Sequence, residues 1–244
     1  MKLMRMKHTI AAGFLLAAFA VPGAAAAQQA VAMTDLNMRA GPGPQFPIVA
    51  VIPGQQGVTI HGCTESANWC DVTWGNERGW AYAQYLAYDM AGQPVIVTQA
   101  TGRIETPTVS YQTTTYWDQH YRDRPFYSER ERYVVTDGSS GAAFGAASGA
   151  VTGAVIGGPI GAAIGGVAGA AIGASIDPPA RVQTYVTERP AEPVLLEGEV
   201  VIGATLPEVV TLYPVPDYEY QYTIVNGQRV LVEPRTRRVV YIYR

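Results

Sequence analysis

Short apolar runs at the period of β-strands mark the N-terminal half of this 244-residue chain. Between residues 31 and 88, runs rich in β-branched and aromatic side chains alternate with Gly, Pro and Asn clusters, a pattern typical of strands and tight turns. The runs lie at residues 49–52, 58–61 and 69–74. The pattern predicts a small all-β domain over residues 31–88.

A second β-rich region, residues 198–244, follows at the C-terminal end. Residues 220–225 and 228–232 flank Asn226-Gly227, the signature of a two-residue type I′ hairpin. Residues 238–243 predict a third strand. The expected cross-strand pairs are Val225 with Gln228 and Tyr222 with Leu231.

The middle of the chain has a different period, because every fourth residue over a long uncharged stretch is glycine. Spaced glycines let two membrane helices approach closely, although they weaken a helix in water. A break at Gly157-Gly158-Pro159 predicts two helices, 141–156 and 160–176, arranged as a hairpin. The glycines are Gly141, Gly145, Gly149, Gly153, Gly157, Gly161, Gly165, Gly169 and Gly173.

Residues 141–176 resemble the glycine-zipper segments of bacterial envelope proteins. The resemblance implies membrane association or self-association, and no chemistry. A second interpretation stays open, in which the segment is a Gly/Ala-rich linker or a low-complexity tract that associates with itself.

The N-terminus predicts an exported protein. Residues 1–27 combine basic side chains, an apolar run and an alanine-rich cleavage region, as in a secretory signal peptide. Its removal leaves 14 arginines against 20 acidic side chains, a formal charge of −6. This balance argues against nucleic acid as the partner. We therefore expect a periplasmic or outer-membrane-associated protein.

Two cysteines, Cys63 and Cys70, remain in the exported chain. An oxidising compartment favours a disulfide between them, and the bridge would join two neighbouring strands. A metal site needs more ligands, and His61 is the only histidine nearby.

Three motifs in the 31–88 region resemble bacterial SH3 domains. The run L-N-M-R-A-G-P at residues 36–42 resembles their L-N-V-R-x-G-P opening. The runs W-C-D-V at 69–72 and G-W-A-Y-A-Q-Y-L at 79–86 resemble their W-x-x-V strand and closing G-W-V-x-x-x-Y-L. The resemblance implies a small β-barrel that binds cell-wall peptide or glycan, or docks a protein partner.

The same motifs supply candidate binding residues. Asn37 and Arg39 either stabilise the loop after their strand or contact ligand. Trp69, Tyr82 and Tyr85 are expected to be exposed aromatic side chains that stack on sugars or peptides. Trp80 and Leu86, in contrast, are expected in the core, because aromatic and aliphatic side chains dominate small cores.

Two segments between these regions predict linkers. Residues 89–140 are mostly polar, with interleaved tyrosines and arginines around residues 116–127, and are expected to form a connector near a membrane surface. Residues 177–197 contain several prolines and predict an extended spacer. The order of Gly, Pro and apolar residues over 198–244 resembles an exported alphaproteobacterial domain of unknown function.

No pair of nucleophile and base, and no cluster of metal ligands, appears in the sequence, so we expect no enzyme, no cofactor and no metal. The predicted fold class is mainly β with a helical segment. It comprises an N-terminal SH3-like β-barrel, a glycine-zipper hairpin, a small C-terminal antiparallel sheet and long flexible linkers. The predicted function is a non-enzymatic envelope protein that binds peptidoglycan or an envelope protein. The alternative is a structural, self-assembling protein without a small ligand.

Overall fold

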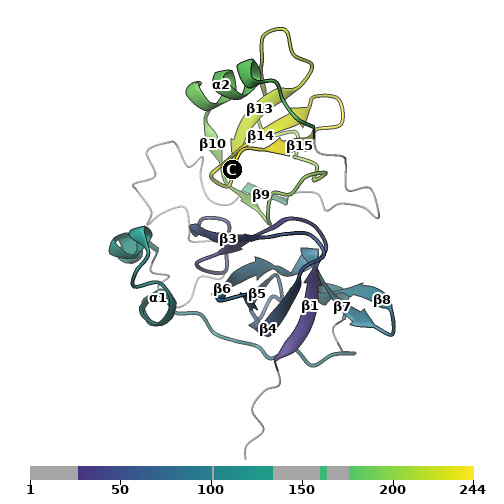
Figure 1. Ribbon diagram of the computed structural model, residues 1–244, viewed down its shortest axis with the longest axis vertical. Helices are drawn as coiled ribbons and strands as arrows, with labels where there is room; N and C mark the ends of the chain where they lie inside the picture. The colour runs from purple at the N-terminus through teal and green to yellow at the C-terminus, as the bar shows by residue number, and fades with distance from the viewer. Residues whose placement is uncertain (1–26, 101, 134–159, 164–175) are drawn as a thin grey trace, which may run out of the picture.

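The computed structural model describes residues 27–100, 102–133, 160–163 and 176–244 (Figure 1). The predicted signal peptide, apart from residue 27, lies outside these residues. So do all the zipper glycines except Gly161. The fold class is confirmed as mainly β, with an antiparallel N-terminal sheet and a small C-terminal sheet.

The N-terminal module is an eight-stranded antiparallel sheet with the order β3-β2-β6-β5-β4-β1-β7-β8. Its strands are β1 (Gln28–Ala32), β2 (Leu36–Arg39), β3 (Ile48–Ile52), β4 (Gly57–Cys63), β5 (Trp69–Trp74), β6 (Glu77–Tyr82), β7 (Leu86–Met90) and β8 (Gln93–Ile96). Short 3-10 helices η1 (Ala83–Tyr85) and η2 (Val97–Gln99) follow β6 and β8. Trp80 and Leu86 are fully buried, which confirms their predicted place in the core.

The cysteines join the hairpin formed by β4 and β5. Cys63 and Cys70 are directly opposed in the register, with Cα atoms 3.9 Å apart, and are bonded as a disulfide. The backbone of Cys63 also forms hydrogen bonds with the segment around residues 107–109, which crosses the end of β4. Its N–H donates to the carbonyl of Pro107 (2.8 Å), and its carbonyl accepts from the N–H of Val109 (2.9 Å).

Residues 89–133 are not a linker in the structure. β8 extends the sheet through a turn at Ala91 and Gly92, whose φ angles are 56° and 81°. Helix α1 (Thr113–His120) and the 3-10 helix η3 (Pro125–Tyr133) then pack on the module, with Trp117 and Tyr121 fully buried. Residues 134–140 of the predicted linker lie outside the described part.

The C-terminal module is a second sheet, in the order β10-β13-β14-β15, with β12 also paired to β13. The Asn226-Gly227 turn has φ angles of 51° and 78°, which suit a type I′ hairpin. Val225 pairs with Gln228 and Tyr222 with Leu231, as the sequence predicts. The strands are β10 (Pro193–Val194), β12 (Tyr213–Pro214), β13 (Gln221–Val225), β14 (Gln228–Glu233) and β15 (Arg238–Ile242).

Two predictions for the neighbouring segments are wrong. The expected spacer at 177–197 contains helix α2 (Ala180–Glu188), which packs on the C-terminal sheet through Val182 and Val186. The expected helix over 160–176 begins instead with strand β9 (Ile160–Ala163), which pairs in parallel with β11 (Leu196–Glu197). No helix among the described residues is long and apolar enough to cross a membrane.

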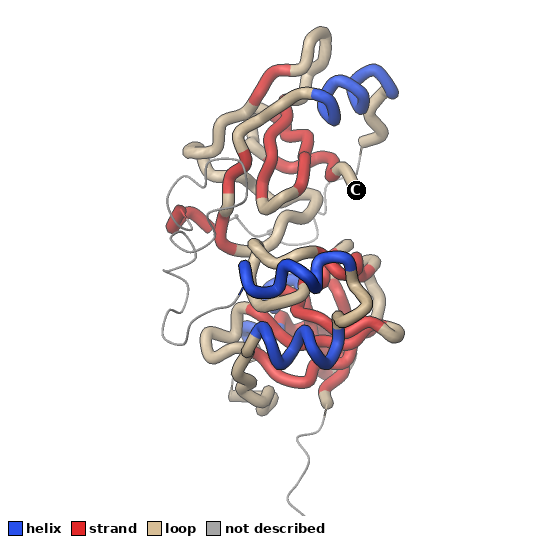
Figure 2. The backbone as a smooth tube through the Cα atoms, turned by 90° about the vertical axis from the view of Figure 1, so that its left-hand side faces the viewer, coloured by secondary structure: helices blue, strands red, loops and turns tan. Residues whose placement is uncertain are grey.

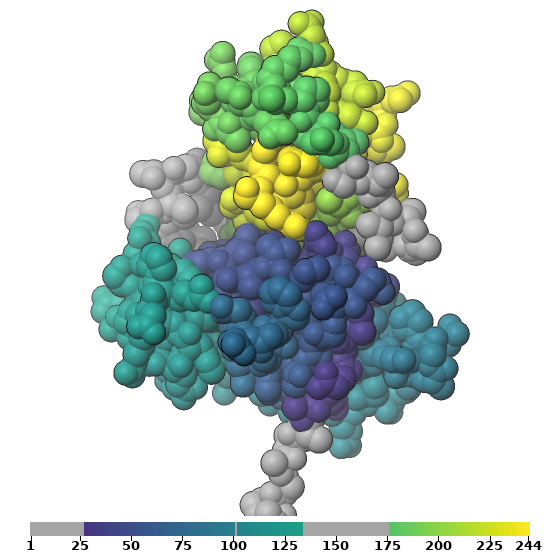
Figure 3. All heavy atoms as spheres, in the orientation of Figure 1, coloured from purple at the N-terminus to yellow at the C-terminus, as the bar shows by residue number. Residues whose placement is uncertain are grey.

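The two modules are packed against each other. Figure 2 shows the C-terminal sheet above the N-terminal one, and Figure 3 shows C-terminal residues resting directly on the N-terminal strands. One continuous cluster of buried apolar side chains includes Leu36 and Tyr85 from the first module and Val200, Val230 and Ile242 from the second. The contact therefore has the character of a shared core.

Candidate functional site

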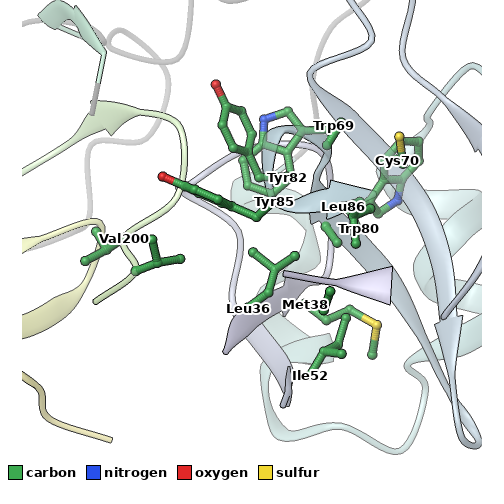
Figure 4. Close-up of a cluster of buried hydrophobic side chains, with 14 of the residues drawn as sticks. Leu36, Met38, Ile52, Trp69, Cys70, Trp80, Tyr82, Tyr85, Leu86 and Val200 are labelled. Carbon is green, nitrogen blue, oxygen red and sulfur yellow. The ribbon is translucent and has the colours of Figure 1, made fainter. Parts of the chain in front are cut away.

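The three predicted stacking aromatics lie together at one end of the N-terminal module (Figure 4). The ring centroids of Trp69 and Tyr82 are 5.3 Å apart, and those of Tyr82 and Tyr85 are 6.0 Å apart. The prediction that these side chains are exposed is wrong, because only 6%, 9% and 4% of their surfaces are accessible. A ligand cannot reach the ring faces in this conformation of the chain.

Asn37 and Arg39 lie on β2 and are each only 2% exposed. The Arg39 guanidinium is fixed by the loop after its own strand. Its Nη1 donates to the carbonyl oxygens of Pro44 (2.9 Å) and Phe46 (2.8 Å). Arg39 therefore stabilises this loop, which is one of the two roles that the sequence left open for it.

The remaining edge of the Arg39 guanidinium binds a carboxylate from the C-terminal module. Glu199 is completely buried. Its Oε2 accepts from Arg39 Nε, and its Oε1 accepts from Arg39 Nη2 at 2.8 Å and from Asn37 Nδ2 at 3.0 Å. This is the bidentate geometry that makes Arg–carboxylate pairs strong and directional.

Glu199 belongs to a segment that we call the strap, residues 196–201. Leu196, Val200 and Val201 are buried, whereas Glu197 points to solvent. Figure 4 shows Val200 facing Leu36 and Tyr85. The strap thus covers the aromatic end of the N-terminal module and closes the predicted binding face.

The hairpin turn of the C-terminal module holds the strap in place. The N–H of Leu196 donates to Asn226 Oδ1 (2.8 Å), and Asn226 Nδ2 donates to the carbonyl of Gly198 (3.0 Å). Gln228 is the first residue after the turn, and its Oε1 accepts from Asn37 Nδ2 (2.9 Å). Asn226 and Gln228 therefore connect the turn to the strap and to β2.

Burial changes the titration of the two tyrosines under the strap. Loss of solvent raises the pKa of Tyr82, and the nearby Glu197 carboxylate adds to that rise. Loss of solvent also raises the pKa of Tyr85, with smaller contributions from Tyr82 and Glu199. Both hydroxyls therefore stay protonated through the physiological pH range.

A second polar cluster lies where α1 covers β5 and β6. The Asp71 carboxylate accepts from Arg78 Nε (2.9 Å) and Nη2 (2.6 Å), and from the Tyr116 hydroxyl (2.7 Å). Burial and the Arg78 charge lower the pKa values of His61 and His120. The cluster fixes α1 on the sheet.

The described residues contain no group of three or more His, Cys, Asp or Glu side chains that could hold a metal ion. The arrangement at Asn37 and Arg39 is suited to binding a carboxylate. Sequence reasoning found these two side chains but missed Glu199, Asn226 and Gln228. A single acidic residue between Gly198 and an apolar run is the only local signal of Glu199.

Comparison with known families gives two matches along the chain. Residues 34–87 match the family model of a bacterial SH3 domain, and residues 185–244 match a domain of unknown function, DUF1236. No curated protein and no solved structure matches the chain. The chain therefore joins a region similar to a bacterial SH3 domain to a region similar to DUF1236, and the buried pair of Arg39 and Glu199 links the two.

Proposed function

We propose that this is a non-enzymatic, exported envelope protein whose SH3-like module binds cell-wall peptide or glycan, or a protein partner. The observation that carries the proposal is the bacterial SH3 match over residues 34–87. That match coincides with a module whose Asn37 and Arg39 hold a carboxylate. A bacterial SH3 domain suggests a binding module. The described residues contain no candidate metal centre.

Export is supported by two independent features. Residues 1–27 have the composition of a secretory signal peptide. The disulfide between Cys63 and Cys70 suits an oxidising compartment, because disulfides rarely persist in a reducing cytosol. The proposed location is the periplasm or the outer membrane.

The glycine register over residues 141–176 adds a second proposed role. Glycines at every fourth position allow close helix packing in a membrane. We assign this segment to membrane association or to self-association of the chain. The strand at Ile160–Ala163 limits any second helix to residues after 163.

A structural, self-assembling protein is the second candidate. It is favoured by the burial of Asn37, Arg39, Trp69, Tyr82 and Tyr85, all of which the chain itself covers. In that candidate the C-terminal module is a permanent partner of the SH3-like module, and no small ligand exists.

Binding of the mature full-length chain to purified cell-wall sacculi tests the proposal. The fragment 31–88 is unsuitable, because it lacks β8 and α1, which belong to the same folded module. We expect retention on sacculi at low salt, and no retention of an unrelated exported protein of similar net charge. Absence of retention, together with the absence of any envelope protein captured by chemical cross-linking in cells, would favour the structural candidate.

A further inference from the structure

We propose that Asn37 and Arg39 form a receptor for the carboxylate of an acidic peptide, and that Glu199 occupies this receptor in cis. The strap is then an intramolecular ligand that keeps the SH3-like module closed. The inference rests on the proposed function, since it assumes that the SH3-like module is a binding module. It adds the chemical class of the ligand and the way in which binding is controlled.

The N–H donors of the receptor belong to the N-terminal module. Two of them also bond the hairpin of the C-terminal module, since Asn37 Nδ2 donates to Gln228 Oε1 (2.9 Å) and Arg39 Nη2 to the carbonyl of Asn226 (3.4 Å). The carbonyls of Pro44 and Phe46 accept from Nη1 of the Arg39 guanidinium, which leaves Nε and Nη2 directed at the strap. Asn37 Nδ2 points to the same place, 3.0 Å from Glu199 Oε1. Three N–H donors that converge on one carboxylate make a preorganised site, and preorganisation favours recognition.

The strap meets this site as a bound peptide would. Gly198 has a φ of 97°, and a Cβ added there would lie 3.5 Å from the ring of Tyr82. The Glu199 carboxylate then accepts hydrogen bonds from the N–H donors, and Val200 packs beside Leu36 and Tyr85. Leu196 and Val200 supply apolar anchors on either side of the buried Glu199 carboxylate.

One buried atom of the receptor has no partner. Asn37 Oδ1 accepts no hydrogen bond in the described part of the chain, although the residue is only 2% exposed. A buried acceptor without a donor is unfavourable, and the N–H of a differently seated peptide would satisfy it. Glu199 and the strap therefore leave one acceptor of the site unsatisfied, and a ligand that donates to it would bind more favourably.

A buried ion pair adds little stability compared with apolar packing of the same volume. The apolar contacts of the shared core would suffice to pack the two modules together without an ion pair. The geometry thus favours recognition of an acidic peptide with a small residue before its glutamate and a β-branched residue after it.

Fluorescence anisotropy with a labelled peptide tests the inference on the full mature chain. The probe is the capped hexapeptide of residues 196–201, and the comparison probe carries Gln in place of the glutamate that corresponds to Glu199. We compare the wild-type chain with Glu199→Gln and with Gly198→Val, which strains the strap because side chains other than glycine rarely adopt a φ of 97°. Glu197→Gln is the matched control, because that carboxylate is exposed two residues away.

A competing peptide binds only those chains whose strap is open. Its apparent affinity is therefore its intrinsic affinity multiplied by the fraction of open chains. We expect Glu199→Gln and Gly198→Val to bind the Glu peptide at least about tenfold more tightly than wild type and Glu197→Gln. The Gln peptide should bind at least about tenfold more weakly than the Glu peptide, because it lacks the charge that Arg39 pairs with. Equal binding of the two peptides would overturn the inference.

The wild-type chain gives a second measurement that does not depend on the folding of a variant. At saturating Glu peptide, the amides of Val200 and Val201 should exchange with solvent faster, because the strap is displaced. Unchanged exchange would overturn the inference. The peptide assay contains no wall material, so it decides the carboxylate site, whereas retention on sacculi decides the proposed function.

Discussion

Replacement of Trp117 by alanine tests whether α1 is an integral part of the SH3-like module. The indole is completely buried. Its Nε1 donates to the carbonyl of Ala40 (2.8 Å) and to the Tyr111 hydroxyl (2.9 Å), and its ring centroid lies 5.1 Å from that of Phe126. The side chain therefore connects α1 and η3 to the loop that fixes Arg39.

The magnitude follows from burial and hydrogen bonding. Removal of a fully buried aromatic side chain costs about 3–5 kcal/mol. The Ala40 carbonyl keeps its hydrogen bond from Tyr111 (2.9 Å), so no backbone acceptor is left unsatisfied. The lost Trp117 hydrogen bond then contributes only about 1 kcal/mol within that range. We expect the free energy of unfolding to fall by about 4 kcal/mol, a large fraction of the stability of a domain.

Urea denaturation followed by far-UV circular dichroism measures this change without relying on tryptophan fluorescence. Trp74→Ala is the matched control, because Trp74 lies in strand β5 of the same module but is only half-buried. We expect a loss of about 1–2 kcal/mol for the control. A loss below about 1 kcal/mol for Trp117→Ala would refute our reasoning and would make residues 113–133 an appended arm.

Three further predictions concern the rest of the chain. Thiol labelling of the unreduced, denatured mature protein should give no signal, and replacing Cys63 and Cys70 by alanine should cost about 2.5 kcal/mol, because the bridge closes a short loop. Burial and a nearby guanidinium hold the pKa values of His61 and His120 below 6.5, so the unfolded chain binds more protons and the free energy of unfolding should fall as the pH drops below that value. Replacing both histidines by glutamine should flatten this decline, and an unaltered decline between pH 7 and 5 would contradict it. Gly149→Leu should weaken self-association measured by cross-linking if the glycine register packs helices, whereas leucine at an alanine outside the register should have a smaller effect.

Elements with local signals were predictable from the sequence. The Asn226-Gly227 turn fixes its own hairpin register, since both central residues adopt positive φ. The cysteine pair likewise follows from two strands joined by a short connection. The hairpin through Ala91-Gly92 escaped prediction, because alanine with a φ of 56° is a weak turn signal.

Elements that depend on distant partners were not predictable. In the sequence, residues 116–127 resemble a polar connector. The burial of their aromatic side chains depends on packing against the loop around Phe46, which is far away in the sequence. For the same reason, only one half of the candidate site could be predicted from the sequence. Asn37 and Arg39 belong to a recognisable motif, whereas their partner Glu199 comes 160 residues after Arg39 and has no pattern that points to β2.

The distance along the chain between Arg39 and Glu199 sets an order of assembly. Synthesis delivers the N-terminal module first, but its aromatic end is completed only when residue 199 has emerged. Closing so long a loop is slow compared with forming local hairpins. A chain that ends before the strap therefore exposes Tyr82 and Tyr85 beside an unpaired arginine. Because such a surface attracts chaperones and proteases, we expect a chain truncated before the strap to be degraded faster than the full chain.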